Sequence, residues 1–440
     1  MKPRLSFRHA VIILTMLTLM AAQSWGTYHV FTSRFPGGND FYARWANGCA
    51  LVWSGTNPYS DEAMLEAQMG MHGHPAQVGE DRAAFAYPLY TLFFFWPLCY
   101  VQPYPLVQAI WMTLMLYALL AAAVLTARVA GWRPGYGIWG ATLMWSVFNY
   151  PHFRAIVLGQ MATLVFLGLA LTLWALRRKK DILAGAVLAV TTIKPQMSFL
   201  LVPWILWWSA WRRRWSVWAG FCGAMVLLVV ISLALVPTWI ADFIEDVRSY
   251  RDSWTQASGS SEELVQQGKD ETVTAQVKNY RSLIWMITRH LLKLGPAAEV
   301  VSVTVLSAYV LLVSWQRRQA DWRGFLWVTG LVLIATNFVA PRTATTHYTM
   351  LLLPLFAWFA QLERGLGRKG RWAVLGVELA LLVGQWLIFL TTVEGTFEAA
   401  LVYLPFPLIM LLVELASRGQ DQALAPLESH AGMHTTEPEM

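Results

Sequence analysis

A few charged and polar residues lie beside glycines, prolines or the ends of long apolar runs, where side chains are well placed for chemistry. One is Asp40, in the stretch Gly37-Gly38-Asn39-Asp40-Phe41, whose glycines allow a sharp turn. A carboxylate at this position could accept the proton of an attacking hydroxyl group, which is the task of a general base. The alternative is a solvated loop aspartate without a chemical role.

The basic members of the set could hold a phosphate or diphosphate group. Lysine supplies a point charge, and arginine supplies a planar fork of N–H donors for phosphate oxygens. The candidates for this binding are Lys194, Arg281, Arg342 and Arg154. Each of them could instead extend its long side chain to lipid headgroups.

Three further polar residues lie near the predicted outer ends of helices. His347 could donate to a leaving phosphate or be an ordinary interfacial histidine, and Gln160 and Asn279 offer side-chain amides. Non-helical backbone at membrane depth is tolerated where it lines a cavity. The gathering of these residues on one side of the membrane therefore favours a site.

Membrane helices are the elements that must position these residues. Of the 440 residues 56% are hydrophobic and only 13% are charged, which is unlike a soluble domain. Apolar runs at residues 10–33, 106–127, 215–236 and 372–391 reach the roughly 20 residues of a spanning helix. The first run could be a cleaved signal peptide, but it is longer than a usual signal-peptide core, so we expect it to be retained.

Clusters of Lys and Arg between the apolar runs set the expected orientation. Residues 177–180, 212–214, 317–323 and 364–371 carry such clusters, and basic loops face the cytoplasm. The segments 31–105 and 238–296 are then extracytoplasmic. The net charge of +7 is explained by topology and lipid headgroups, and no nucleic-acid partner is expected.

Two apolar segments are too short to span on their own. Residues 87–100 are interrupted by prolines, so a re-entrant or juxtamembrane helix is predicted. Residues 181–211 contain Lys194-Pro195 near the middle and are predicted to form a hairpin whose outer tip lines a wet cavity. The result is an all-α polytopic protein with about twelve transmembrane helices and cytoplasmic termini, with one membrane domain over residues 1–416 and a disordered tail over residues 417–440.

Several function classes lack their sequence signals. There is no Asp-x-Asp motif, Gly-rich Walker loop, His-Glu-x-x-His motif or defensible Ser-His-Asp set, so no nucleotide and no other cofactor is expected. His72-Gly73-His74 has too few ligands for a predicted metal site. The cysteines Cys49, Cys99 and Cys222 have no metal or redox spacing, which favours buried thiols.

The order of several short motifs resembles glycosyltransferase family 87, the polyprenyl-phosphate-mannose-dependent mannosyltransferases. The resemblance extends over residues 40–354. It is carried by residues 38–42 with 55–59, Tyr87-Pro88-Leu89, Leu158-Gly159-Gln160, Ile193-Lys194-Pro195 and residues 340–354, with 279–283 as a weaker match. The chain departs from the family pattern at Leu89, where a second proline is usual, and at Tyr348, where a second histidine is usual.

The resemblance implies a GT-C-type fold and an inverting transfer. A sugar, mannose in particular, would pass from a polyprenyl-phosphate donor to a hydroxyl of a glycolipid or glycan acceptor at the periplasmic face of a bacterial plasma membrane. Asp40 matches the catalytic aspartate and would be the general base. Lys194, Arg342 and His347 would stabilise the leaving lipid phosphate, and Tyr87 joins the candidate donor site.

Two other functions fit the same broad features. A lipid or sugar transporter or flippase would also be a polytopic bundle with charges at membrane depth, although an inverted repeat is missing and the outer loops are long. An oligosaccharide ligase or polymerase that uses a diphosphate-linked donor should have a large outer loop with essential Arg and His residues.

Overall fold

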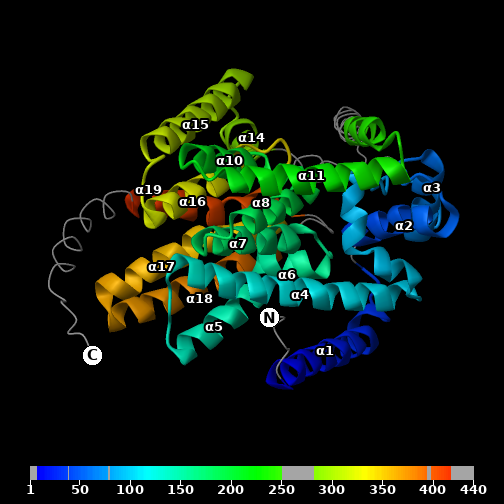
Figure 1. Cartoon of the computed structure of the whole chain (residues 1–440), viewed down its shortest axis with the longest axis horizontal. Helices are drawn as coiled ribbons and strands as arrows, with labels where there is room; N and C mark the ends of the chain where they lie inside the picture. Colours follow the sequence, from blue (N-terminus) through cyan, green and yellow to red (C-terminus); the bar gives the residue numbers. More distant parts are fainter. Residues whose placement is uncertain (1–6, 38, 78–79, 250–281, 394–397, 418–440) are drawn as a thin grey trace.

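The computed structural model describes residues 7–37, 39–77, 80–249, 282–393 and 398–417 of the chain, and these residues form helices and loops without a β-strand (Figure 1). Asn279 and Arg281, two of the predicted site residues, lie outside the described residues, as does most of the predicted tail. The all-α architecture expected from the sequence is therefore confirmed.

Seven described helical segments are long and apolar enough to cross a membrane. They are α1 (Phe7–Thr27) with η1 (Tyr28–Thr32), α4 (Tyr104–Ala130), α11 (Trp215–Leu235), α15 (Pro296–Gln316), α16 (Trp322–Val339), α18 (Arg368–Thr392), and η7 (Ala400–Tyr403) with α19 (Pro405–Ser417). The four long spans predicted from the sequence are among them. The protein is a polytopic membrane protein.

Shorter helices lie between these spans. They are α5 (Tyr136–Phe148), α6 (Tyr150–Val157), α7 (Ala162–Arg177), α8 (Asp181–Val190), α10 (Leu201–Trp211) and α17 (Leu352–Leu366). Together α6 and α7 are long and apolar enough for one span, but they are bent by 114° relative to each other. The predicted number of twelve crossings stays a prediction, because it depends on counting helices of 10 to 16 residues.

The basic connections lie together at one end of the bundle. Arg177 donates to the carbonyl of Val129 at 2.8 Å, and Trp322 donates to the same carbonyl at 3.1 Å. Arg212 donates to the carbonyl of Gln319 at 2.8 Å, and Arg214 forms an ion pair with Asp181. Connections far apart in the sequence therefore form one hydrogen-bonded end.

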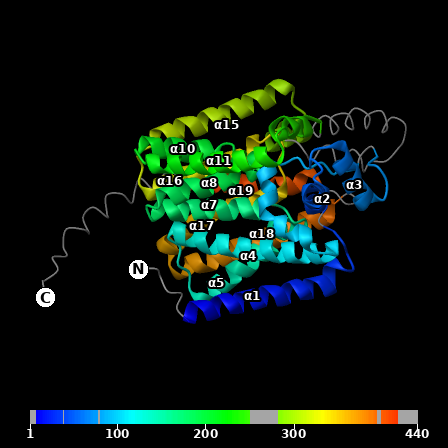
Figure 2. The same cartoon turned by 45° about the vertical axis from the view of Figure 1, so that its right-hand side comes forward.

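The opposite end carries a layer, here called the outer layer, built from the segment 31–105 that the sequence predicts to be extracytoplasmic. It contains α2 (Asn39–Ser54), α3 (Asp61–His72) and two 3₁₀ helices, η2 (Leu89–Phe94) and η3 (Trp96–Tyr100). Figure 2 shows α2 and α3 beside each other at this end of the roughly parallel long helices. Residues 87–100 thus form no spanning helix, which confirms the re-entrant or interfacial prediction.

The expectation of buried thiols is wrong for all three cysteines, since Cys222 is a free thiol on an exposed residue and the other two are paired. Cys49 on α2 and Cys99 on η3 form a disulfide, with their Cα atoms 5.3 Å apart. Both side chains are buried. A spacing of 50 residues gives no motif for sequence reasoning to detect, because the pairing depends on how η3 packs against α2.

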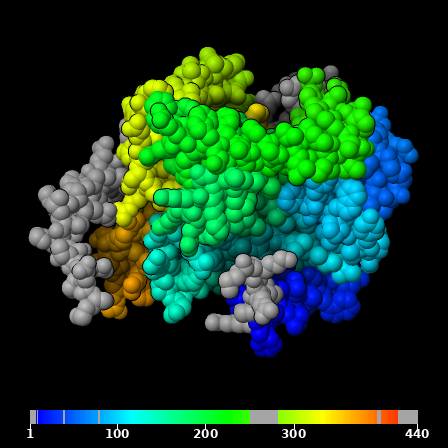
Figure 3. Space-filling view, in the orientation of Figure 1, coloured from blue at the N-terminus to red at the C-terminus, as the bar shows by residue number. Residues whose placement is uncertain are grey.

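Burial differs sharply between helices and separates the core from the lipid-facing surface. In the most apolar stretch of 18 residues in α16, 83% of the residues are buried. In the corresponding stretch of α1 with η1, only 6% are buried. Figures 2 and 3 show α1 along one edge of the molecule, packed beside α4. Exposed apolar side chains on α1 suit contact with acyl chains, since lipid is as apolar as they are.

Two glycines set the distance between α8 and α11. A Cβ atom at Gly185 would lie 1.9 Å from the Val217 carbonyl oxygen, and one at Gly220 would lie 2.1 Å from the Ile182 carbonyl oxygen. Small residues let membrane helices approach backbone to backbone. This contact holds α8, which leads directly to the turn at Lys194.

We predict that Gly185→Ala destabilises the protein, because the added methyl group meets backbone atoms that cannot rotate away. Overpacking of this kind costs about 1–3 kcal/mol. Thermal unfolding in detergent should show a lower midpoint. Gly223→Ala is the matched control, because a Cβ atom there meets nothing within 4 Å, and equal midpoints for both variants would contradict the packing argument.

Candidate functional site

A chain of hydrogen bonds joins three of the predicted site residues. The Gln160 side-chain amide donates from Nε2 to Oδ2 of Asp40 at 2.6 Å, and its Oε1 accepts from Nζ of Lys194. The three residues are 34 or more positions apart in the sequence. The structure therefore brings a carboxylate and a buried lysine to the two ends of one amide.

Gln160 owes its position to the bend between α6 and α7. Gly159 has φ of +63°, and a Cβ atom there would lie 2.7 Å from Cβ of Phe41. Glycine is needed because other residues are strained in this conformation. The indole of Trp111 donates to the Gly159 carbonyl at 2.8 Å and stacks on Phe41 with 4.5 Å between ring centres. The bend is thereby fixed against the first turn of α2, where Asp40 lies.

Lys194 lies at the break of the predicted hairpin. The segment η4 (Thr191–Ile193) ends before it, and α9 (Pro195–Ser198) begins after it. Tyr90 on η2 forms a hydrogen bond with the Thr192 hydroxyl at 2.9 Å. The short outer helix therefore supports the turn, and the side chain of Lys194 is only 2% exposed. The break predicted at Lys194-Pro195 is present, whereas a wet cavity at this tip stays a prediction.

Further charges surround Lys194. Asp40, Arg44, Arg342 and Arg154 all lie close enough to act electrostatically on its ammonium group. His347, on η6 (Thr345–Leu351), is buried and lies within electrostatic reach of both Lys194 and Arg342. Arg342 and His347 thus belong to the same cluster as Asp40.

Arg154 has an acidic partner that the sequence analysis missed. Its Nη1 lies 3.0 Å from Oε2 of Glu398. The buried Glu398 carboxylate also accepts hydrogen bonds from the hydroxyls of Tyr150 and Tyr403, both at 2.7 Å, and of Thr345, at 2.5 Å. This carboxylate joins α6, η6 and η7. Arg154 therefore belongs to the hydrogen-bonded network around Glu398, and its charge is already paired within the protein.

Arg44 is a second residue that the sequence analysis missed. It lies one helical turn after Asp40 on α2, and its guanidinium lies over the ring of Tyr87 at 5.3 Å from the ring centre. Both side chains are buried. The spacing of four residues from Asp40, which places both on one helix face, was a signal that could have identified it.

The loop that carries Tyr87 is held by the helical residues 239–249, which belong to the segment 238–296 that is predicted to be extracytoplasmic. Asp246 accepts a hydrogen bond from the backbone N–H of Ala86 at 2.7 Å, and Asp242 accepts one from Asn57 at 2.7 Å. Tyr59 donates to the Tyr87 carbonyl at 2.7 Å. Burial raises the pKa of Asp246 to about 6, while Arg44 and Arg82 act in the opposite direction. Asp242 and Asp246 of this helix thus face the neighbouring loops, whereas Glu245 is exposed.

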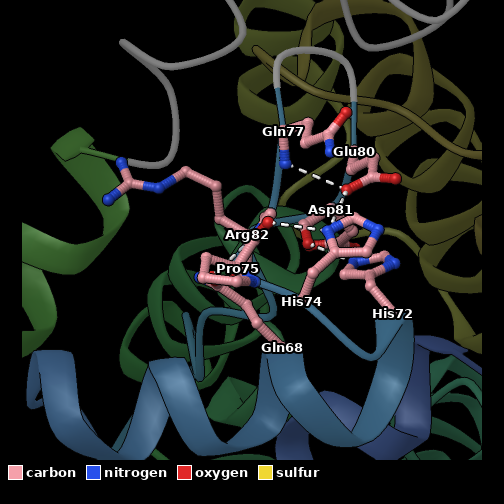
Figure 4. Close-up of polar contacts among 9 residues, drawn as sticks. Gln68, His72, His74, Pro75, Gln77, Glu80, Asp81 and Arg82 are labelled. Atoms are coloured by element: carbon pink, nitrogen blue, oxygen red, sulfur yellow. Dashed lines mark hydrogen bonds and ion pairs between the residues drawn. The ribbon is translucent and has the colours of Figure 1, made fainter.

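The His72-Gly73-His74 stretch has contacts of its own in this outer layer (Figure 4). Nε2 of His72 lies 3.0 Å from the Asp81 carbonyl, and Nδ1 of His74 lies 2.9 Å from the Pro75 carbonyl. Gln68 on α3 donates to the Arg82 carbonyl at 2.8 Å. These contacts fasten the loop before Tyr87 to α3. In the described part of the chain, no three His, Cys, Asp or Glu residues gather as a metal site would require.

Fold and cluster together define a membrane-embedded protein with a charged, partly buried site at one end of its bundle. The sequence model of glycosyltransferase family 87 matches residues 85–336. Because this is more than half of the chain, the protein belongs to glycosyltransferase family 87 and is a glycosyltransferase, in keeping with the GT-C superfamily. The matched region includes Tyr87, Arg154, Gln160 and Lys194.

Comparisons with individual proteins add nothing to the family match. Neither the curated proteins nor the solved structures with which the chain was compared give a match. Asp40, Arg342 and His347 lie outside the matched residues. Their inclusion in the candidate site rests on the geometry described above and on the resemblance of their motifs.

We predict that Glu398→Gln lowers both thermal stability and transferase activity, because it leaves the Arg154 charge unpaired near the core. Breaking a fully buried ion pair costs about 3–5 kcal/mol, and we expect a smaller loss here because the Arg154 side chain is 28% exposed. Thermal unfolding and a transfer assay measure the two effects. Glu378→Gln is the matched control, since Glu378 is equally buried but accepts a hydrogen bond only from the Thr142 hydroxyl in the described residues.

The double variant with Arg154→Gln and Glu398→Gln separates charge from packing. It should recover part of the lost stability, since no buried charge is then left alone. A double variant that is no more stable than Glu398→Gln would contradict the pairing described here.

Proposed function

We propose that this glycosyltransferase moves a sugar, in particular mannose, from a polyprenyl-phosphate donor to an acceptor hydroxyl on the extracytoplasmic face. The observation that carries the proposal is the Asp40–Gln160–Lys194 chain, which links a candidate base to a candidate phosphate-binding cation. A transfer that inverts the anomeric centre needs both groups, one for each side of the sugar.

In the proposed reaction Asp40 takes the proton of the acceptor hydroxyl as its oxygen attacks the anomeric carbon. The bond between that carbon and the phosphate oxygen breaks, and the electron pair leaves with the lipid phosphate. Lys194, Arg342 and His347 stabilise this leaving group, and Gln160 keeps Asp40 and Lys194 apart at a fixed separation. Tyr87, placed by Arg44, adds an aromatic wall near the donor.

The charge of the cluster favours an anionic donor. Arg44, Arg154, Lys194 and Arg342 gather with two carboxylates, Asp40 and Glu398. Even with Asp246 counted beside Arg44, the cations outnumber the acids. A modest positive excess suits a lipid monophosphate, which is why we prefer this donor to the diphosphate of an oligosaccharide ligase.

Two observations support an outward-facing site with both termini in the cytoplasm. The basic connections form the end of the bundle remote from Asp40, and basic loops face the cytoplasm. The Cys49–Cys99 disulfide belongs to the layer that contains Asp40, and disulfides persist in oxidising compartments such as the periplasm. We therefore assign the protein to a bacterial plasma membrane, with residues 1–416 as one membrane domain and a cytoplasmic tail.

We predict that Asp40→Asn abolishes sugar transfer while the protein stays folded, because an amide cannot take the proton but can still accept from Gln160. Loss of a general base costs about 10²–10⁴-fold in rate. The assay uses purified protein in lipid with polyprenyl-phosphate sugars of several kinds and follows release of polyprenyl phosphate. Asp61→Asn, on the exposed start of α3, is the control. Retained activity in Asp40→Asn would remove Asp40 from the mechanism.

We predict that Lys194→Ala and Arg342→Ala mainly weaken donor use. A hydrogen bond to a charged group is worth about 1.5–3 kcal/mol, which corresponds to a rise in the apparent donor KM of about ten- to a hundredfold. Lys180→Ala and Arg178→Ala, both exposed at the opposite end of the bundle, are the matched controls. An unchanged donor KM in both site variants would argue against contact with the phosphate.

A further inference from the structure

A cavity of about 230 Å³ opens in the outer layer, separate from the Asp40 cluster. Four aromatic rings and two polar side chains contribute to its lining, namely Tyr42, Trp45, Trp53, Tyr104, Glu66 and Gln102. They come from α2, α3 and the residues around the start of α4. Pockets for drug-sized ligands enclose roughly 300–1,000 Å³, so this cavity suits a smaller, ring-sized group.

The aromatic rings of this cavity are held in place before any ligand arrives. The indole N–H of Trp45 donates to the Leu98 carbonyl at 3.2 Å, and that of Trp53 donates to the Cys99 carbonyl at 2.8 Å. Trp45 also packs against Trp53 and Tyr104, with ring centres 5.2 and 5.0 Å apart. Because both indole N–H groups are used by η3, the rings offer apolar surface to a ligand.

Glu66 and Gln102 supply the polar part of the lining. Both residues are exposed, as is Trp53, so the cavity is open to the solution. Aromatic ring faces carry partial negative charge, which suits the C–H bonds on one face of a pyranose ring. A carboxylate and an amide can hydrogen-bond the hydroxyl groups at its edge, and such a mixture of apolar surface and few polar groups fixes orientation.

The cavity lies on the side of α2 away from Asp40 and Arg44. With 100° per residue in an α-helix, Trp45 and Trp53 point to the face opposite Asp40. Tyr104 connects the two sides, because it lines the cavity and lies within electrostatic reach of Asp40. Asp40 is in the first turn of α2, so a short saccharide chain can pass over the start of this helix.

We propose that this cavity binds a pyranose ring of the acceptor glycan, remote from the ring that receives the new sugar. The inference rests on the proposed function and adds that the acceptor is a chain of several sugars. The exposed Trp53 would also suit a lipid headgroup at a membrane surface. The acidic Glu66 and the exposed amide favour an uncharged polyhydroxylated ligand over an anionic headgroup.

Binding is tested first, on the full-length protein in lipid nanodiscs without donor. The probes are methyl α-mannopyranoside and a linear mannotetraose, observed by saturation-transfer NMR and titrated by calorimetry. We expect Glu66→Gln and the cavity-filling Ala46→Phe to weaken binding at least tenfold. Glu62→Gln, an exposed residue one turn earlier on α3, should bind as the unchanged protein does. Equal binding by all variants overturns the proposal, and so does absence of probe binding to the unchanged protein.

The Asp40→Asn protein separates this inference from the proposed reaction. It should bind mannotetraose like the unchanged protein, although it transfers no sugar. Binding that disappears in Asp40→Asn while Glu66→Gln still binds would place the glycan at the Asp40 cluster and overturn the cavity proposal. A failure of Asp40→Asn to lose activity would count against the reaction alone.

A kinetic readout distinguishes glycan binding from a structural role. In Glu66→Gln the acceptor KM for the tetrasaccharide should rise about tenfold toward that of the methyl glycoside, with kcat unchanged. A loss of kcat for both acceptors would indicate a structural defect and overturn the proposal. Displacement of the probes by anionic phospholipid vesicles would identify a headgroup site instead and overturn the proposal.

Discussion

The burial of the Lys194 ammonium group is the constraint on which the site depends. A lone charge removed from water is costly, and at membrane depth there is little solvent to compensate it. The Lys194 ammonium group donates a hydrogen bond to the side-chain oxygen of Gln160. The nitrogen of the same amide donates to the Asp40 carboxylate. Three separate segments must therefore meet at one place, and each of them interrupts regular helix near that place.

These breaks in the helices are tolerated because neighbouring parts of the bundle pack against them. The bend at Gly159 is filled by Phe41 and Trp111, and the turn at Lys194 is supported by η2. Backbone that leaves helical geometry within a membrane needs other partners for its polar groups. Glu398 links the side chains of the η6 and η7 region by accepting from three hydroxyls as well as from Arg154. The site is thus held by groups that need not touch a substrate.

The sequence was informative where the signal is local. Long apolar runs identified spanning helices, and prolines marked residues 87–100 and Lys194-Pro195 as breaks. Short motifs placed Asp40, Gln160 and Lys194 in one candidate site. The sequence could not identify Glu398, because its partners Arg154, Tyr150 and Thr345 come from distant segments. The same reason applies to Cys49 and Cys99, because the packing of α2 against η3 produces no recognisable pattern in the sequence.

The disulfide also bears on how the newly made chain can thread through the bilayer. Residues 87–100 are apolar enough to be mistaken for a spanning segment by an insertion machinery that measures hydrophobicity. Had they crossed, Cys99 would emerge in the compartment opposite Cys49, and the two thiols could never meet. The disulfide between α2 and η3 thus marks correct insertion, because it can form only in molecules in which both segments lie on the same side of the membrane.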